Sequence, residues 1–220
     1  RREHFATIGE LAAGLAHEVR TPAGVIKGAA QFLTREARAK EREFLDIIVE
    51  EADRLNGVVT EFLEYARPSQ RAPRTMTLRE PVEKAVALLL REKGERMARV
   101  RHHVLVPDPA PRVNADPAEV ERVVYNLLTN AVEAMPQGGE LTVRVGSVGG
   151  EARVVVEDTG AGIPEKDRPH LFRPFFTTRE RGVGMGLAIC RRIVEENGGS
   201  ISVDSLPGRG SRFTVKLPEA

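Results

Sequence analysis

The 220-residue sequence has one cysteine, Cys190, and it has no run of 18 or more apolar residues, the length that a membrane-spanning helix needs. A single cysteine excludes an internal disulfide framework and a multi-cysteine metal site, and it fits a reducing compartment. The N-terminus lacks the apolar core of a signal peptide. Neither sign of charge dominates, because the sequence has 33 basic and 32 acidic residues. The charge balance therefore gives no reason to expect nucleic acid or an anionic membrane as a partner.

Apolar residues in the first 63 positions recur at three- and four-residue steps, the period of a helix with one buried face. One stripe runs from Phe5 to Leu33 and a second from Phe44 to Leu63, with the charged stretch TREARAKERE between them. This pattern predicts an antiparallel helical hairpin over residues 1–66 that leaves both stripes half covered. We expect two copies to pair as a four-helix bundle, in a homodimer. The helical spacing of apolar residues is present from the start of the sequence. We therefore expect a further region upstream, such as a sensor or a membrane anchor.

The stretch ARPSQRAPRT contains two prolines, three arginines and no large apolar side chain, which is typical of an exposed linker. We place the linker at residues 67–77 and a second domain at residues 78–220. Helices are expected there at 79–93, 118–135 and 185–198, and strands at 100–106, 140–148, 151–158, 200–205 and 211–217. The fold class is therefore α+β: a helical hairpin followed by an α/β domain with adjacent antiparallel strands.

Two motifs of the second half carry polar residues that suit a ligand. NLLTNAVEAM puts Asn126 and Asn130 on one face of a helix, where paired amides can bind a ligand or a hard cation such as Mg²⁺. VVVEDTGAGIP ends a strand with Asp158, followed by Gly160 and Gly162. That carboxylate can accept from an exocyclic amine, and glycines let the backbone approach a flat ring. Taken singly, the first motif fits helix-face polarity and the second fits an ordinary turn.

Two further motifs follow. LFRPFFTT gathers three of the eight phenylalanines in one segment, which favours an aromatic anchor for a loop or a small satellite core. RGVGMGLAIC puts Gly182, Gly184 and Gly186 directly before a helix, where backbone N–H groups favour phosphate. The motif does not follow a strand, as a dinucleotide fingerprint requires, and no G-x-x-x-x-G-K-[ST] occurs, which excludes a P-loop.

In order and spacing the four motifs resemble the N, G1, F and G2 boxes of the sensor histidine kinases, of an NtrB-like subclass. These belong to the GHKL (Bergerat) superfamily, which also includes the Hsp90, MutL and gyrase ATP-binding domains. The resemblance implies an α/β sandwich that binds ATP and Mg²⁺ under a lid at about residues 164–183. It further implies roles for single residues: Asn130 and Asn126 at the metal and phosphates, Asp158 at the adenine amine, Gly160 and Gly162 at the base, and Gly182, Gly184, Gly186 and the lid cation Arg179 at the phosphates.

GLAHEVRTP in the first helix resembles the H box of the same family. At 100° per residue, His17 lies about 180° from Ile8 and about 160° from Val19, opposite the apolar stripe. His17 is therefore expected to face solvent, where another domain can reach it. Adjacent Glu18 can accept a proton from one imidazole nitrogen while the other attacks. By resemblance, Glu18 assists phosphorylation and Thr21 assists dephosphorylation of the partner.

The sequence thus predicts a cytoplasmic kinase core that transfers the γ-phosphoryl group of Mg-ATP to its own His17. The expected second partner is the receiver domain of a response regulator, with an aspartate as acceptor. We expect neither nucleic acid nor membrane contact by this fragment, although the full protein could be membrane-anchored. Two alternatives stay open: a degenerate dimeric scaffold of the same family, and another GHKL ATPase or serine kinase. The signal, the cognate regulator and transfer within or between protomers are not readable from the sequence.

Overall fold

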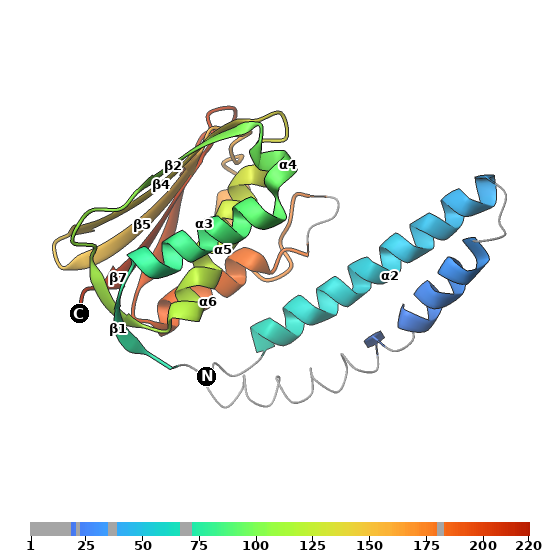
Figure 1. Ribbon diagram of the computed structural model, residues 1–220, viewed down its shortest axis with the longest axis horizontal. Helices are drawn as coiled ribbons and strands as arrows, with labels where there is room; N and C mark the ends of the chain where they lie inside the picture. The colour runs from blue at the N-terminus through green and yellow to red at the C-terminus, as the bar shows by residue number, and fades with distance from the viewer. Residues whose placement is uncertain (1–18, 21–22, 35–38, 67–71, 180–182) are drawn as a thin grey trace. The chain divides into compact units, whose positions relative to one another are not determined.

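The computed structural model describes residues 19–20, 23–34, 39–66, 72–179 and 183–220. Two compact units result, one of Arg1–Gln70 with Phe175–Met185 and the other of Arg71–Pro174 with Gly186–Ala220. Figure 1 shows a helical part and a sheet-containing part.

The first unit is built on two helices, residues 23–34 and α2 (Ala39–Ala66) (Figure 1). Ala23, Ala30 and Ala52 are buried to 4% exposure or less, because small side chains let two helices approach closely. Lys27 Nζ lies 2.6 and 2.8 Å from the two carboxylate oxygens of Asp53, so an ion pair also joins the helices. The predicted helices are confirmed over these residues.

The helices of the first unit expose large apolar side chains that a single copy leaves uncovered. Their exposed fractions run from 38% to 72%, for Val19, Val25, Ile26, Phe32, Leu33, Phe44, Ile47, Ile48 and Leu55. Exposed large apolar side chains gathered on two helices favour association with a partner.

The second unit contains a five-stranded sheet in the order β2-β4-β5-β7-β6. The bounds are Val100–Leu105 for β2, Gly139–Val148 for β4, Glu151–Asp158 for β5, Ser211–Pro218 for β7 and Ser200–Ser205 for β6. Each expected strand is present, but β2 pairs with β4 in parallel. The prediction of adjacent antiparallel strands is wrong for this pair, because a helix crosses between the two strands and a crossover brings the second strand back in the same direction.

Three helices, α3 (Arg79–Glu92), α5 (Pro117–Glu133) and α6 (Gly186–Glu196), lie on one face of the sheet (Figure 1). A single turn, α4 (Gly94–Met97), and a 3-10 turn, η1 (Arg168–His170), complete the unit. Along β5, the residues Ala152, Val154 and Val156 are 1% exposed and face the helices, while the residues between them face the opposite side. The result is a two-layer sandwich with one helix-covered face.

A short antiparallel ladder, β1 (Arg74–Thr77) with β3 (Arg112–Ala115), precedes α5. The sequence interpretation assigned residues 74–77 to the linker and missed both strands, since each has only four residues and one or two inward apolar side chains. Asp116 then begins α5 with one carboxylate oxygen accepting from Ala118 N at 2.9 Å, and its other oxygen accepts from Ala72 N at 2.9 Å. The ladder and Asp116 thereby fix the start of α5.

Candidate functional site

On three neighbouring strands, every second side chain faces the helices. The side chain at one end of each such series is polar, whereas the others are apolar. These residues are Asp158 on β5, Ser211 on β7 and Ser205 on β6, with exposed fractions of 4%, 6% and 7%. Asp158 pairs with Ser211 across one ladder, and Ser205 pairs with Ser211 across the next. Directly opposite residues share a face of the sheet, so the three form a row under the helices. We call these three residues the polar row.

The loop at residues 159–163 leaves the polar row and is held from two sides. At its start, Gly160 N donates to Asp158 Oδ1 at 2.8 Å. Ala161 N donates to the carbonyl of Ala134, just after α5, at 3.1 Å, and the Ala161 carbonyl accepts from Gly208 N at 2.7 Å. The loop therefore lies between the end of α5 and the turn that joins β6 to β7.

The two glycines of this loop are required by its packing. A Cβ at Gly160 would lie 2.5 Å from the carbonyl oxygen of Ala134. Gly162 has φ +69° and a Cβ there would lie 2.1 Å from the carbonyl oxygen of Leu206. A side chain at Gly160 would push the loop away from the end of α5, and one at Gly162 would push it away from the turn between β6 and β7, so both positions require glycine.

Asn126 of α5 lies at the N-terminus of α6. A Cβ at Gly186, the first residue of α6, would lie 3.9 Å from Asn126 Oδ1. The first turn of a helix has backbone N–H groups without helical partners, which favour an anion. Cys190, one turn further along α6, is fully buried, and burial raises the pKa of its thiol to about 12. It is a core residue.

Helix α5 links these two places. Ala134, whose carbonyl holds the loop, follows Asn130 by four residues and Asn126 by eight, or roughly 6 and 12 Å along the helix axis. A buried row of oxygen atoms thus lies toward one end of the helix and N–H donors of α6 lie further along it. This arrangement suits an elongated ligand with a hydrogen-bond donor at one end and an anion at the other.

The remaining predicted residues lie outside the described residues or in the other unit. His17, Glu18, Thr21 and Gly182 lie outside the described residues. Gly184 and the exposed Arg179 belong to Phe175–Met185, which groups with the helical unit. In that segment Gly184 has φ +75°, and a Cβ on it would lie 2.6 Å from the carbonyl oxygen of Phe176, so this position also requires glycine.

The candidate metal ligands are amides. Within the described ranges, no group of three or more His, Cys, Asp or Glu side chains could hold a metal ion. Asn126 and Asn130 offer side-chain carbonyl oxygens, the hard ligands that Mg²⁺ accepts. Two such oxygens fit a Mg²⁺ ion that takes its other ligands from phosphate and water.

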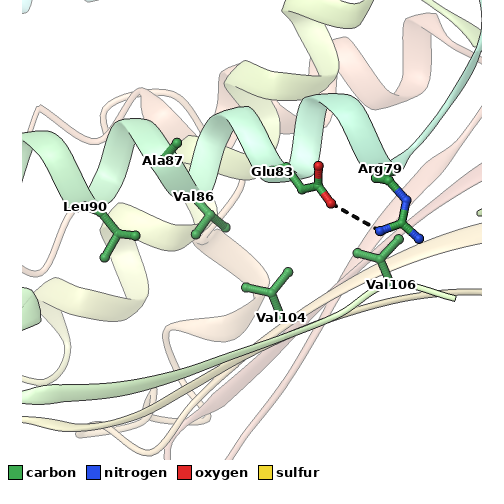
Figure 2. A pocket seen from close by; sticks show the side chains of 7 residues that line it. All are labelled: Arg79, Glu83, Val86, Ala87, Leu90, Val104 and Val106. Atoms are coloured by element: carbon green, nitrogen blue, oxygen red, sulfur yellow. Dashed lines mark hydrogen bonds and ion pairs between the residues drawn. The ribbon is translucent and has the colours of Figure 1, made fainter.

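A hollow of about 320 Å³ lies between α3 and β2 (Figure 2). Arg79 and Glu83, one turn apart on α3, form a hydrogen bond of 3.2 Å at its edge, and apolar side chains line the rest. Of the predicted site residues that the structure describes, none lines it. The hollow is therefore separate from the polar row.

The sequence interpretation missed Ser205, Ser211 and Gly210. The signal was present, because the strands SISVDS and SRFTVKL alternate inward apolar residues and each puts one serine into that set next to the turn. Asp158 was found from the same pattern on β5. Gly210 sits in the turn with φ +83°, beside the backbone of Asp158.

Two family models match the chain. Residues 7–71 match the His Kinase A (phospho-acceptor) domain, and residues 115–220 match the histidine kinase-, DNA gyrase B- and HSP90-like ATPase. The chain belongs to the sensor histidine kinases. Its first matched segment includes His17, and its second includes the whole polar row. The NtrB-like subclass of histidine kinases stays a prediction.

Curated relatives and solved structures agree with this assignment. The sensor histidine kinase ZraS of Escherichia coli O157:H7 is 37% identical over 220 residues, which cover 99% of this chain and 48% of ZraS. The chain therefore spans about half the length of this histidine kinase. The crystal structure of full-length ShkA in complex with AMPPNP has a TM-score of 0.75 at 26% identity, over 96% of this chain and 46% of ShkA. Histidine kinase ThkA in complex with the response regulator TrrA has a TM-score of 0.72 at 30% identity, over 100% of this chain and 64% of that chain.

Proposed function

We propose that this chain is the kinase core of a sensor histidine kinase, which phosphorylates its own His17 from Mg-ATP and passes the phosphoryl group to an aspartate of a response regulator. The observation that carries the proposal is the joint occurrence of a matched phospho-acceptor segment around His17 and a matched ATPase segment with a buried, hydrogen-bonded polar row. Dephosphorylation of the regulator, assisted by Thr21, is part of the proposal.

In the transfer step, one imidazole nitrogen of His17 forms a bond to the γ-phosphorus while the bond from that phosphorus to the β–γ bridging oxygen breaks. ADP leaves with the bond's electron pair, and Glu18 accepts the proton from the other imidazole nitrogen. Such transfers depend on positioning and on neutralisation of charge more than on covalent help. One nucleophile, one base and a phosphate site therefore suffice.

Binding of the nucleotide is assigned to the sandwich. Asp158 accepts from the adenine amine, and the loop with Gly160 and Gly162 covers the base. Asn126, Gly184, Gly186 and the N–H groups of α6 take the phosphates, with Gly182 and Arg179 contributing from the lid at about residues 164–183. Asn130, with Asn126, is the candidate ligand of Mg²⁺, which neutralises phosphate charge when bound.

The functional unit is proposed to be a homodimer. The exposed apolar side chains on residues 19–34 and on α2 support pairing with a second copy, which would cover them in a four-helix bundle. The ThkA structure was solved with a response regulator, which supports a regulator as the second partner here. Neither nucleic acid nor membrane is proposed as a partner of this fragment.

A cytoplasmic location is proposed for this region. In the described ranges, no helix combines the length and the apolar character that crossing a membrane requires.

The proposed function is tested by labelling with [γ-³²P]ATP. A phosphohistidine bond is labile in acid and survives base, so the label is expected to be lost in acid and retained in base. The His17→Gln variant is expected to take up none. Label that resists acid, or that persists in His17→Gln, would contradict the assignment of His17 as acceptor.

A further inference from the structure

Ser205 ends β6, and its hydroxyl makes three polar contacts. It accepts from the backbone N–H of Ile163 at 2.8 Å and donates to the carbonyl of Gly210 at 2.8 Å. Its Oγ also lies 3.0 Å from the Oγ of Ser211. Ser205 is 7% exposed, so these protein groups rather than water satisfy the hydroxyl.

Only one arrangement of protons makes all three contacts hydrogen bonds. A serine hydroxyl has one proton and two lone pairs. The Ile163 N–H can only donate and the Gly210 carbonyl can only accept, which uses one lone pair and the single proton of Ser205. Ser211 must then donate to the second lone pair. The proton of Ser211 is thereby committed to Ser205, and the Ser211 oxygen is left as an acceptor.

We propose that Ser205 fixes the direction of the Ser211 hydroxyl, so that the polar row presents only acceptors and selects an aminopurine over an oxopurine nucleotide. Ser211 is the partner of Asp158 across the β5–β7 ladder, so its acceptor stands beside a carboxylate. Adenine brings an amine to such a place, whereas guanine brings a carbonyl oxygen that would leave acceptors unpaired. The inference rests on the proposed binding of ATP and makes Ser205 a positioning residue that acts through Ser211.

The test measures the affinities of ADP and GDP for the full chain by titration calorimetry. In Ser205→Ala, the Ser211 hydroxyl is free to turn and donate to a carbonyl. The preference for ADP over GDP is expected to fall about fivefold, which corresponds to the net contribution of one hydrogen bond. Ser205→Thr keeps the hydroxyl and is expected to retain the preference.

A merely structural role for Ser205 predicts a different result. Loss of the contact to Ile163 would loosen the loop and weaken the binding of both nucleotides equally. The ratio of the ADP affinity to the GDP affinity would then stay unchanged. A double-mutant cycle separates the two roles further. In a Ser211→Ala background, Ser205→Ala is expected to add no further change in the ratio. Ser202→Ala, at an exposed position of the same strand, is the matched control.

Two results would overturn the inference without touching the proposed function. One is an equal loss of ADP and GDP affinity in Ser205→Ala, and the other is an additive change of the affinity ratio in the double variant. Binding of ADP and GDP with equal affinity by the unmodified chain would do the same. Binding of neither would overturn the proposed function and this inference with it. Where Ser205→Ala fails to fold, Ser205→Cys replaces it, since a thiol is a weak donor and acceptor, and the same direction is expected.

Discussion

A Cβ at Gly210 would lie 1.8 Å from the carbonyl oxygen of Asp158, so the turn between β6 and β7 packs directly against the backbone of Asp158. Gly210→Ala must displace one of these two segments. The free energy of unfolding is expected to fall by about 3 kcal/mol, from overpacking together with strain at φ +83°. Urea unfolding measures the change.

Gly208 provides the matched control for that substitution. It lies in the same turn with φ +73°, but a Cβ there has no atom within 4 Å. Gly208→Ala therefore carries only the cost of the left-handed backbone, about 1 kcal/mol. Equal losses in both variants would show that backbone strain, rather than contact with Asp158, governs this turn.

Sequence periodicity could predict the long helices and the sheet strands, because their buried faces repeat at a fixed spacing. The alternation along β5, with Asp158 as the last inward residue, also marks the start of the site. Two kinds of feature could not be read this way. The parallel pairing of β2 with β4 depends on a crossover in space, and the contact of Gly210 with Asp158 joins residues 52 positions apart that only the register of the ladder brings together.

On the sheet face away from the helices, Glu157 lies between two arginines, each at 2.9 Å. The hydrogen bond from Arg212 is the largest cause that lowers the pKa of this carboxyl, followed among the favourable contacts by that from Arg144. A carboxyl whose folded pKa is lowered stabilises the fold fully above its unfolded pKa, about 4.3, and loses that contribution as the pH falls through the folded pKa.

Glu157→Gln is therefore expected to be less stable than the unmodified chain at pH 7, and the difference is expected to shrink as the pH falls below about 4. Denaturant unfolding at several pH values measures it. Glu95→Gln, at an exposed position of α4, serves as the comparison. A difference that stays constant down to pH 3 would mean that the charge of Glu157 contributes nothing to stability.

Ile48 and Leu55 lie seven residues apart on α2, on one face of the helix, and are 40% and 48% exposed. If this stripe is covered in the homodimer, Ile48→Lys with Leu55→Lys buries two charges and is expected to give a monomer at concentrations where the unmodified chain is dimeric. Light scattering after size exclusion measures the mass. Asp46→Lys, at an exposed polar position of α2, should leave the dimer intact; a dimer that survives the double substitution would place the interface elsewhere.

Asn130 is half-buried on α5, one turn before the residue whose carbonyl holds the loop. As the proposed ligand of Mg²⁺, it contributes to ATP affinity only when the metal is present. In Asn130→Ala, the gain in ATP affinity on adding Mg²⁺ is expected to shrink at least about tenfold, while ATP affinity in EDTA stays close to that of the unmodified chain. Asn114→Ala, at an exposed position of β3, controls for loss of an amide as such. Equal loss of affinity with and without Mg²⁺ would instead make Asn130 a direct contact of the nucleotide, because only a metal ligand loses its effect when the metal is removed.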